Sequence, residues 1–343
     1  MRVLFLTQAT ELGPSSRYRV YQLLPLLRQL GIEGEVSPAI DSALYTRIYL
    51  EGRGSRRAAL LAAWKQRRID LERAVEFDAV FVQKGVFPGL YSGFECKLAK
   101  RKPVIFDLDD AIWLPRKGGN PLLRKLHRES AVHEILRSSA AVIAGNGFLA
   151  DYASRFNKHV TVVPSCLNTA RYPRGNSEPR IGWIGSSTTL PYLTALRGVF
   201  ETLRVTPRVI ASGDAAALGF AADFRPWRLE NELDELAQIG IGISPLPDTP
   251  WERGKCGVKL LQYMACGIPV VASPVGVHHD IVRDGQNGFL AANDEQWIEL
   301  LGRLIRDAEL RQRLGAAGRE TVAQRYDVGM AAESVASVLR SVR

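Results

Sequence analysis

Two lysines near the start of one predicted helix are the residues of this chain best suited to hold an anion. Lys255 and Lys259 are four residues apart, and residues 256–266 have the apolar spacing of a buried helix. Gly267 ends that helix, and the apolar run 268–272 has the length of a strand. Because free N–H groups and the positive end of the dipole favour anions at a helix start, we predict a diphosphate there. The periodicity alone fits an ordinary buried helix with two solvated lysines equally well.

A second contact with phosphate is predicted at a strand-to-helix turn. Gly185, Ser186 and Ser187 follow an apolar run, and their backbone is able to approach a phosphate closely. Residues 181–196 contain no Lys or Arg, so Lys255 and Lys259 are expected to supply the positive charge there too.

Three carboxylates follow another apolar run, in the segment PVIFDLDDAIW of residues 103–113. Asp107 and Asp109 have the spacing of a haloacid-dehalogenase phosphatase, in which Asp107 would attack as the nucleophile and Asp109 would act as the general acid, with Mg²⁺ between them. Ala111 stands where that family has Thr or Val, and this interpretation leaves residues 254–288 unexplained. The carboxylates also fit a structural role, capping a turn or pairing with basic helices.

The elements that must position these residues alternate between strand and helix in two rounds. Strands are predicted at 3–6, 78–82, 104–106, 141–144 and 160–163, before a linker, 164–179, that holds three prolines and a glycine. A second round begins at Ile181. We predict an α/β protein with two doubly wound, Rossmann-like domains facing a cleft, and ligands at the carboxyl ends of the strands.

The segment that contains the two lysines resembles the signature of the retaining, glycogen-synthase-like family 4 glycosyltransferases. That signature reads E-x-F-G-x-x-x-x-E-A-M-A-x-G, followed by P-V-V-A-T and a Gly-rich loop. Its two glutamates, placed on the donor sugar and the ribose, fall on Gly254 and Gln262; Gln262 can still hydrogen-bond a ribose hydroxyl. Glu252 and Lys255 are candidate substitutes for the sugar contact. The residues in register are Gly257, Met264, Ala265, Gly267, Pro269, Val270, Val271 and Ala272.

The resemblance implies further site residues. With Gly185, Ser186 and Ser187, the donor site would comprise Lys255, Gly257, Lys259 and Gln262. In these transferases a strand of the first domain commonly ends in P-V-V-x-x-x-H-D, with its histidine near the reacting carbon. Aligning the strands puts Asp109 at the histidine and Asp110 at the aspartate, so both are predicted to be catalytic. Arg17 and Arg19, in the loop after the first strand, are expected with Asp107 to contact the acceptor or a phosphate, unless the arginines are solvated charges at a helix start.

The resemblance also implies the two-domain architecture known as GT-B. Residues 1–168 would form the acceptor-side domain and residues 169–328 the nucleotide-sugar-binding domain. A helix at about 329–343 would pack back onto the first domain. The region between residues 141 and 172 supports this division, because it resembles the last βαβ unit and the hinge of such proteins.

Composition agrees with a two-domain enzyme. The chain has 343 residues, of which 46% are hydrophobic and 24% are charged. Its start, MRVLFLTQATELG, has too short an apolar run for a signal peptide, and a cytoplasmic location is expected. The four cysteines lack C-x-x-C spacing and are expected to be reduced, and neither a metal nor a cofactor is expected.

The charge is strongly basic, with a net value of +9 and a pI near 9.5. Residues 53–68 contain six Lys or Arg and no acid, and residues 116–128 contain five and no acid. Basic helices with an apolar face fit an anionic membrane surface near a lipid-linked acceptor, and they also fit a merely solvated surface. No helix-turn-helix, zinc-finger or RNP-type pattern points to nucleic acid.

These patterns and the resemblance together predict a retaining glycosyltransferase. It would move a sugar from a nucleotide-diphosphate sugar to an acceptor hydroxyl in glycan or glycolipid biosynthesis. A nucleotide-sugar epimerase of the same fold, the phosphatase, and a non-catalytic sugar-nucleotide-binding homologue are the alternatives.

Overall fold

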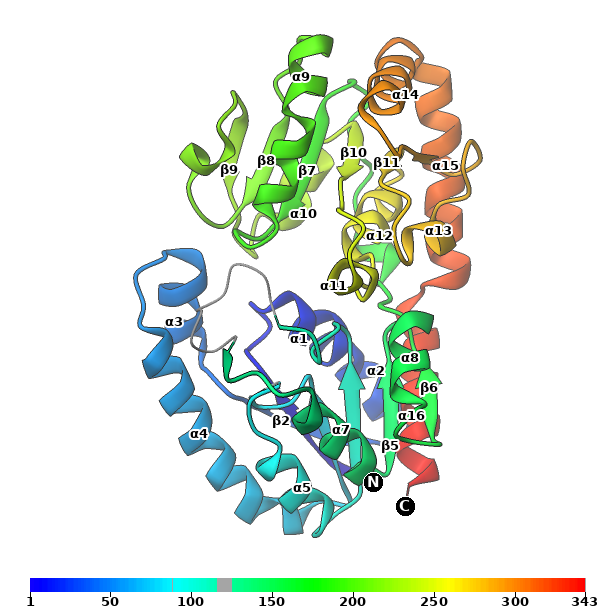
Figure 1. Ribbon diagram of the computed structural model, residues 1–343. Helices are drawn as coiled ribbons and strands as arrows, with labels where there is room; N and C mark the ends of the chain where they lie inside the picture. The colour runs from blue at the N-terminus through cyan, green and yellow to red at the C-terminus, as the bar shows by residue number, and fades with distance from the viewer. Residues whose placement is uncertain (88, 116–124, 343) are drawn as a thin grey trace.

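The molecule has two halves, each built on a six-stranded sheet in which every pairing is parallel (Figure 1). The strands of the first half lie within residues 2–162, and those of the second half lie within residues 181–290. The computed structural model describes residues 1–87, 89–115 and 125–342. Helices flank both sheets, so the α/β class with two Rossmann-like domains is confirmed.

The first sheet has the order β2-β1-β3-β4-β5-β6. Its four central strands are almost wholly buried, as expected for a parallel sheet covered on both faces. The rings of Phe5 and Phe81, which are paired in register on neighbouring strands, have their centroids 5.1 Å apart. The strands are β1 (Arg2–Thr7), β2 (Glu33–Pro38), β3 (Ala79–Gln83), β4 (Val104–Leu108), β5 (Ala141–Ala144) and β6 (Val160–Val162).

The second sheet has the order β12-β11-β10-β7-β8-β9. Its central strand β10 is buried at all positions and pairs with β11 on one side and β7 on the other. The strands are β7 (Ile181–Gly185), β8 (Arg208–Ala211), β9 (Asp223–Pro226), β10 (Ile241–Ser244), β11 (Val270–Ala272) and β12 (Phe289–Leu290).

Helices of the first half cover both faces of its sheet and are fixed locally by caps and apolar stripes. The Asn146 side chain accepts a hydrogen bond from the Leu149 N–H and so caps α8. The helices are α1 (Pro14–Arg19), α2 (Leu24–Gln29), α3 (Ser42–Tyr45), α4 (Arg56–Arg73), α5 (Gly93–Ala99), α7 (Glu129–Ser138) and α8 (Gly147–Ala153).

The helix predicted at residues 256–266, with the two lysines near its start, is shorter than expected. It begins at Val258 rather than Cys256, because Gly257 adopts the left-handed conformation, with φ of 67°, immediately before it. Lys255 therefore lies in the loop that enters the helix, and Lys259 lies in its first turn. The helices of the second half are α9 (Arg197–Leu203), α10 (Glu232–Ala237), α11 (Pro250–Arg253), α12 (Val258–Ala265), α13 (His278–Ile281), α14 (Asp294–Arg306) and α15 (Ala308–Arg325).

The last helix, α16 (Val328–Ser341), returns to the first half of the chain. It packs against α2, and Arg340 donates a hydrogen bond to the Leu30 carbonyl at 2.6 Å (Figure 1). Just before α16, the returning chain lies beside residue 167: the Leu167 N–H donates to the Tyr326 carbonyl, and the Val328 N–H donates to the Leu167 carbonyl. The second half is therefore connected to the first through two segments of the chain.

Candidate active site

Loops from both halves meet around a cluster of four charged side chains. Asp110, just after β4, lies between two lysines: its Oδ2 is 2.5 Å from Lys84 Nζ and its Oδ1 is 2.8 Å from Lys255 Nζ. Asp109 joins the cluster through an ion pair of 3.2 Å with Lys84. The two predicted catalytic carboxylates and one predicted donor-binding lysine are thus neighbours in space.

The lysines set the charge state of Asp110. Burial alone would raise the pKa of its carboxyl group, but Lys255 and Lys84 outweigh burial and hold that pKa well below its ordinary range. Burial would likewise lower the pKa of Lys84, but Asp109 and Asp110 raise it above its ordinary value. Asp110 and Lys84 are therefore both ionised near neutral pH.

Lys84 was not among the residues predicted for the site. It follows β3 with a positive φ of 62°, which is uncommon for a residue other than glycine, and its ammonium group also donates to the Ser15 hydroxyl at 2.8 Å. The ion pairs of Lys84 with Asp109 and Asp110 offset the energetic cost of this backbone conformation. A lone lysine after an apolar strand carries no local pattern that could have identified it.

Gly254, which replaces the first glutamate of the signature, lies tightly against the first half. A Cβ atom at this position would come within 2.9 Å of both the backbone nitrogen and the Cβ of Ala111. Glu252, one candidate substitute, accepts a hydrogen bond from Tyr192 at 2.6 Å on one carboxylate oxygen and from the Thr249 hydroxyl on the other. Lys255, the other candidate, pairs with Asp110. A close contact between the two halves takes the place of a side chain here.

Lys259 lies beside the predicted phosphate-binding turn. Its Nζ is 4.1 Å from the centre of the Trp183 ring, donates to the Thr189 hydroxyl at 3.1 Å, and lies 2.9 Å from where a Cβ on Gly185 would be. Burial, followed by repulsion from Lys255, lowers its pKa to about 7. Within the described part of the chain, no carboxylate lies within salt-bridge distance of Lys259.

The serines of the turn bond to their surroundings. The Ser187 N–H donates to the Ser212 hydroxyl at 3.2 Å, and the Ser186 and Thr188 hydroxyls lie 2.8 Å apart. The turn at Gly185 has no cation of its own, and the start of α12 supplies one in Lys259. The structure brings these two segments together, as the sequence predicted from their charges.

Gln262, which replaces the second glutamate, takes part in a contact across the two halves. Its amide donates to the Tyr18 hydroxyl at 2.9 Å and to Glu232 at 3.2 Å. Glu232 also accepts a hydrogen bond from Trp227 Nε1 and forms a salt bridge of 2.8 Å with Arg17. Sequence analysis missed Glu232, a buried carboxylate 30 residues before Gln262.

Three first-half residues expected to contact the acceptor or a phosphate are paired within the protein. Arg17 forms a salt bridge with Glu232, and its contact with the acceptor or a phosphate stays a prediction. Arg19 and Asp107 are both buried and form an ion pair with each other at 2.5 Å, and Arg19 also donates to the Val163 carbonyl. These two residues therefore hold the loop after β1 to the sheet. Asp107, which is fully buried against a guanidinium, is not placed to attack a phosphate ester.

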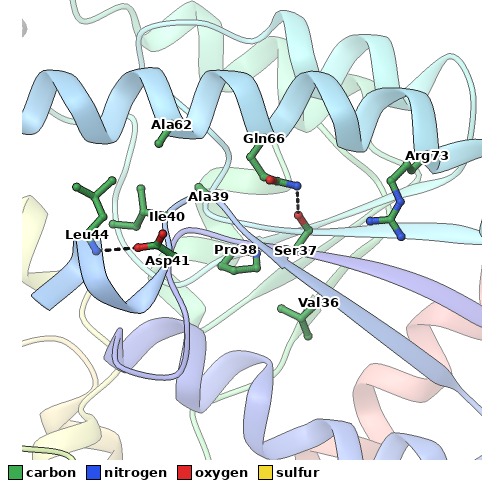
Figure 2. Close-up of a pocket in the computed structure, with 10 residues that line it drawn as sticks. All are labelled: Val36, Ser37, Pro38, Ala39, Ile40, Asp41, Leu44, Ala62, Gln66 and Arg73. Atoms are coloured by element: carbon green, nitrogen blue, oxygen red, sulfur yellow. Dashed lines mark hydrogen bonds between the residues drawn. The ribbon is translucent and has the colours of Figure 1, made fainter.

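A cavity of about 330 Å³ between β2, α3 and α4 lies apart from these charges (Figure 2). At its wall, the Gln66 amide donates to the Ser37 hydroxyl at 3.1 Å, and the Leu44 N–H donates to Asp41. None of the predicted site residues lines it. The chemistry of the site thus belongs to the loops between the halves rather than to this cavity.

Neither a metal centre nor a membrane-spanning helix is found among residues 1–87, 89–115 and 125–342. No group of three or more His, Cys, Asp or Glu residues there is arranged to hold a metal ion. No helix there is both long enough and apolar enough to cross a membrane. All four cysteines are free thiols.

Comparison with known proteins finds a family match within the second half. Residues 233–321 match the profile of the family described as glycosyl transferases group 1. A phosphatidyl-myo-inositol mannosyltransferase of Mycobacterium leprae is 38% identical over 88 residues, which are 25% of this chain and 23% of that protein. A D-inositol 3-phosphate glycosyltransferase of Nocardia farcinica is 25% identical over 57% of this chain and 50% of that protein. The chain thus spans half or less of the length of these relatives.

Solved structures share the fold over the whole chain. HepE of Anabaena in complex with UDP-glucose has a TM-score of 0.75 at 16% identity, covering 99% of this chain and 100% of that one. Sucrose-phosphate synthase of Thermosynechococcus elongatus has a TM-score of 0.75 at 14% identity, covering 99% and 98%. The predicted GT-B architecture and the resemblance to family 4 glycosyltransferases are both confirmed.

Proposed function

We propose that this chain, whose residues 233–321 belong to the group 1 glycosyl transferases, transfers a sugar from a nucleotide-diphosphate sugar to an acceptor hydroxyl, with retention. One observation carries the proposal: Lys259 is a partly buried lysine without a carboxylate partner among the described residues, and it faces the turn at Gly185. An anion beside such a lysine favours its charged form. A diphosphate between Lys259, Lys255 and the turn would be that anion.

The same arrangement serves the chemistry of transfer. Negative charge develops on the leaving diphosphate as the bond to the sugar breaks, and cations already in position stabilise it without reorganisation. Lys255 would exchange its contact with Asp110 for the phosphate. We propose that the two lysines replace a divalent metal and that no cofactor is needed.

UDP-glucose is the first donor to test, because HepE, which shares the fold, has been solved with UDP and with UDP-glucose. In this chain Gln262 is proposed to hydrogen-bond the ribose. Gly257 would act through the backbone, since a Cβ there would come within 2.4 Å of Ile281.

Lys255→Ala is expected to weaken the binding of UDP-glucose by about 1.5 to 3 kcal/mol, the range for a hydrogen bond to a charged group. Isothermal titration calorimetry without divalent metal measures this. Arg253→Ala is the matched control, because Arg253 is two residues away, exposed, and paired with Asp248. Equal affinity in the wild type and Lys255→Ala would remove Lys255 from the site.

The affinity for UDP-glucose is also expected to fall as the pH rises through 7. The pKa of Lys259 is lowered to about 7, so its ammonium form, which attracts the diphosphate, is present below pH 7 and is lost above it. The phosphates of a nucleotide sugar are diesters and keep their charge over this range. We expect binding to be about tenfold weaker at about pH 8.5 than at about pH 6.5, with proton uptake on binding.

Calorimetry in buffers of different ionisation enthalpy detects that proton. Lys259→Met should bind weakly at both pH values and abolish the proton uptake. The assignment fails if this variant keeps the pH dependence of the wild type.

The acceptor and location form the rest of the proposal. We propose a glycan or lipid-linked acceptor, with residues 1–168 on the acceptor side, residues 169–328 on the donor side, and the protein working at the cytoplasmic face of a membrane. The absence of both signature glutamates favours one rival, a non-catalytic sugar-nucleotide-binding protein. Formation of a glycosylated product from UDP-glucose and an acceptor separates transfer from that rival and from epimerisation.

A further inference from the structure

Helix α4 exposes apolar side chains among basic ones. Leu61 is 54% exposed and Trp64 is 41% exposed, although both are residues that are usually buried. Arg57, Lys65 and Arg68 lie on the same outward side, at helical spacings of three and four residues from these two. Figure 1 shows α4 along the outer side of the first half.

The opposite face of α4 fixes the helix to the sheet. Arg67 and Asp70 are buried and form an ion pair of 2.6 Å, and Arg67 also donates to the carbonyls of Thr7 and Ser37. Arg67 was counted in the basic segment 53–68, but it anchors the helix instead of facing outward. The other basic segment, 116–128, lies largely outside the described residues.

A groove of about 440 Å³ continues the outward face of α4 towards α5. Its wall combines aromatic rings with cations: the Arg68 guanidinium lies 4.8 Å from the centre of the Trp64 ring, and Tyr91 is 43% exposed. Lys97 and Arg101, both exposed, line the far side. Glu72 is the one acidic residue in the lining.

We propose that this surface, formed by Arg57, Leu61, Trp64, Lys65 and Arg68 of α4 with Tyr91, Lys97 and Arg101 across the groove, docks on a bilayer of anionic lipids. Cations attract the negative lipid surface, while leucine and aromatic rings enter the boundary between headgroups and acyl chains. The charge of the surface is complementary to such a bilayer, with five cations against one acid, Glu72.

The mixture of side chains favours a bilayer over a soluble phosphorylated ligand. Such a ligand would neutralise Arg68, Lys97 or Arg101, but it would leave Leu61 and the outer edge of Trp64 in water. A bilayer satisfies both kinds of group at once. The proposal concerns where the protein sits, and it does not depend on the residues that bind the donor.

Co-sedimentation with vesicles tests the proposal with the full chain. Vesicles that mix phosphatidylserine with phosphatidylcholine should bind the protein, and binding should fall with salt. Replacing Arg57, Lys65 and Arg68 by Gln together is expected to lower the partition coefficient about a hundredfold. The matched control removes the same charge from the second half, with Arg303, Arg306 and Arg313 changed to Gln.

A second variant isolates the apolar part. Leu61→Ser with Trp64→Ser should weaken the binding that remains at high salt, while UDP-glucose affinity and the unfolding temperature of both variants stay near those of the wild type. The proposal is overturned if the protein binds vesicles of phosphatidylcholine alone equally well, or if neither the charge-removing nor the apolar-to-serine variant binds more weakly. It is also overturned if the second-half control variant loses as much binding as the α4 variant. Full displacement from vesicles by millimolar inorganic phosphate at constant ionic strength would overturn it too, because it would identify a site for a soluble anion.

Discussion

Asp109→Asn is expected to lower sugar transfer about a hundredfold or more, the scale of losing a positioned catalytic group. Asp109 is buried, and its Oδ1 forms an ion pair of 3.2 Å with Lys84 but makes no hydrogen bond of good geometry to any described residue. We propose that this carboxylate stabilises positive charge that develops at the sugar carbon, or orients the acceptor hydroxyl. Because Asn has nearly the same shape, UDP-glucose affinity and folding should stay close to those of the wild type.

Asp110→Asn provides the contrast. Asp110 bridges Lys84 and Lys255, so its loss should change donor affinity as well as transfer. Radiolabelled transfer assays with saturating donor separate the two effects. Transfer by Asp109→Asn at a near-normal rate would end its catalytic assignment, and a phosphoryl group trapped on Asp107 would restore the phosphatase.

Asp107→Ala is expected to lower the free energy of unfolding by about 3 to 5 kcal/mol, because it leaves the buried charge of Arg19 without its partner. Urea unfolding followed by circular dichroism measures this loss. Asp248→Ala removes a carboxylate from an exposed pair with Arg253 and should cost at most about 1 kcal/mol. If the two variants lose equal stability, the pair of Arg19 and Asp107 does not hold the first half together.

Sequence predicted the central strands well and the edges poorly. The strands around β1, β4 and β11 are apolar runs, because parallel strands covered on both faces must bury every side chain. Sequence analysis missed β2 (Glu33–Pro38) and β9 (Asp223–Pro226), which lie at sheet edges and carry exposed, polar residues. Each of these edge strands forms because it hydrogen-bonds to a neighbouring strand, β1 or β8, and the local sequence pattern does not indicate that contact.

The site shows a similar division. Residue types and spacing indicated Lys255, Lys259 and the turn at Gly185, because a helix start and a glycine turn have local signatures. Lys84 and Glu232 were missed, since their roles arise only from partners far away in sequence. The pairing of Arg19 with Asp107 joins residues 88 apart, and it turned two expected ligand contacts into part of the scaffold.

The contact at Gly254 limits the substitutions open to this position. Any residue with a Cβ would come within 2.9 Å of the Ala111 backbone, which cannot swing aside as the end of a flexible side chain would. Gly254→Glu would therefore restore the glutamate that the family signature has at this position, but it would force the two halves of the molecule apart. Evolution or design could return a carboxylate to the donor sugar more readily from another loop than from this one.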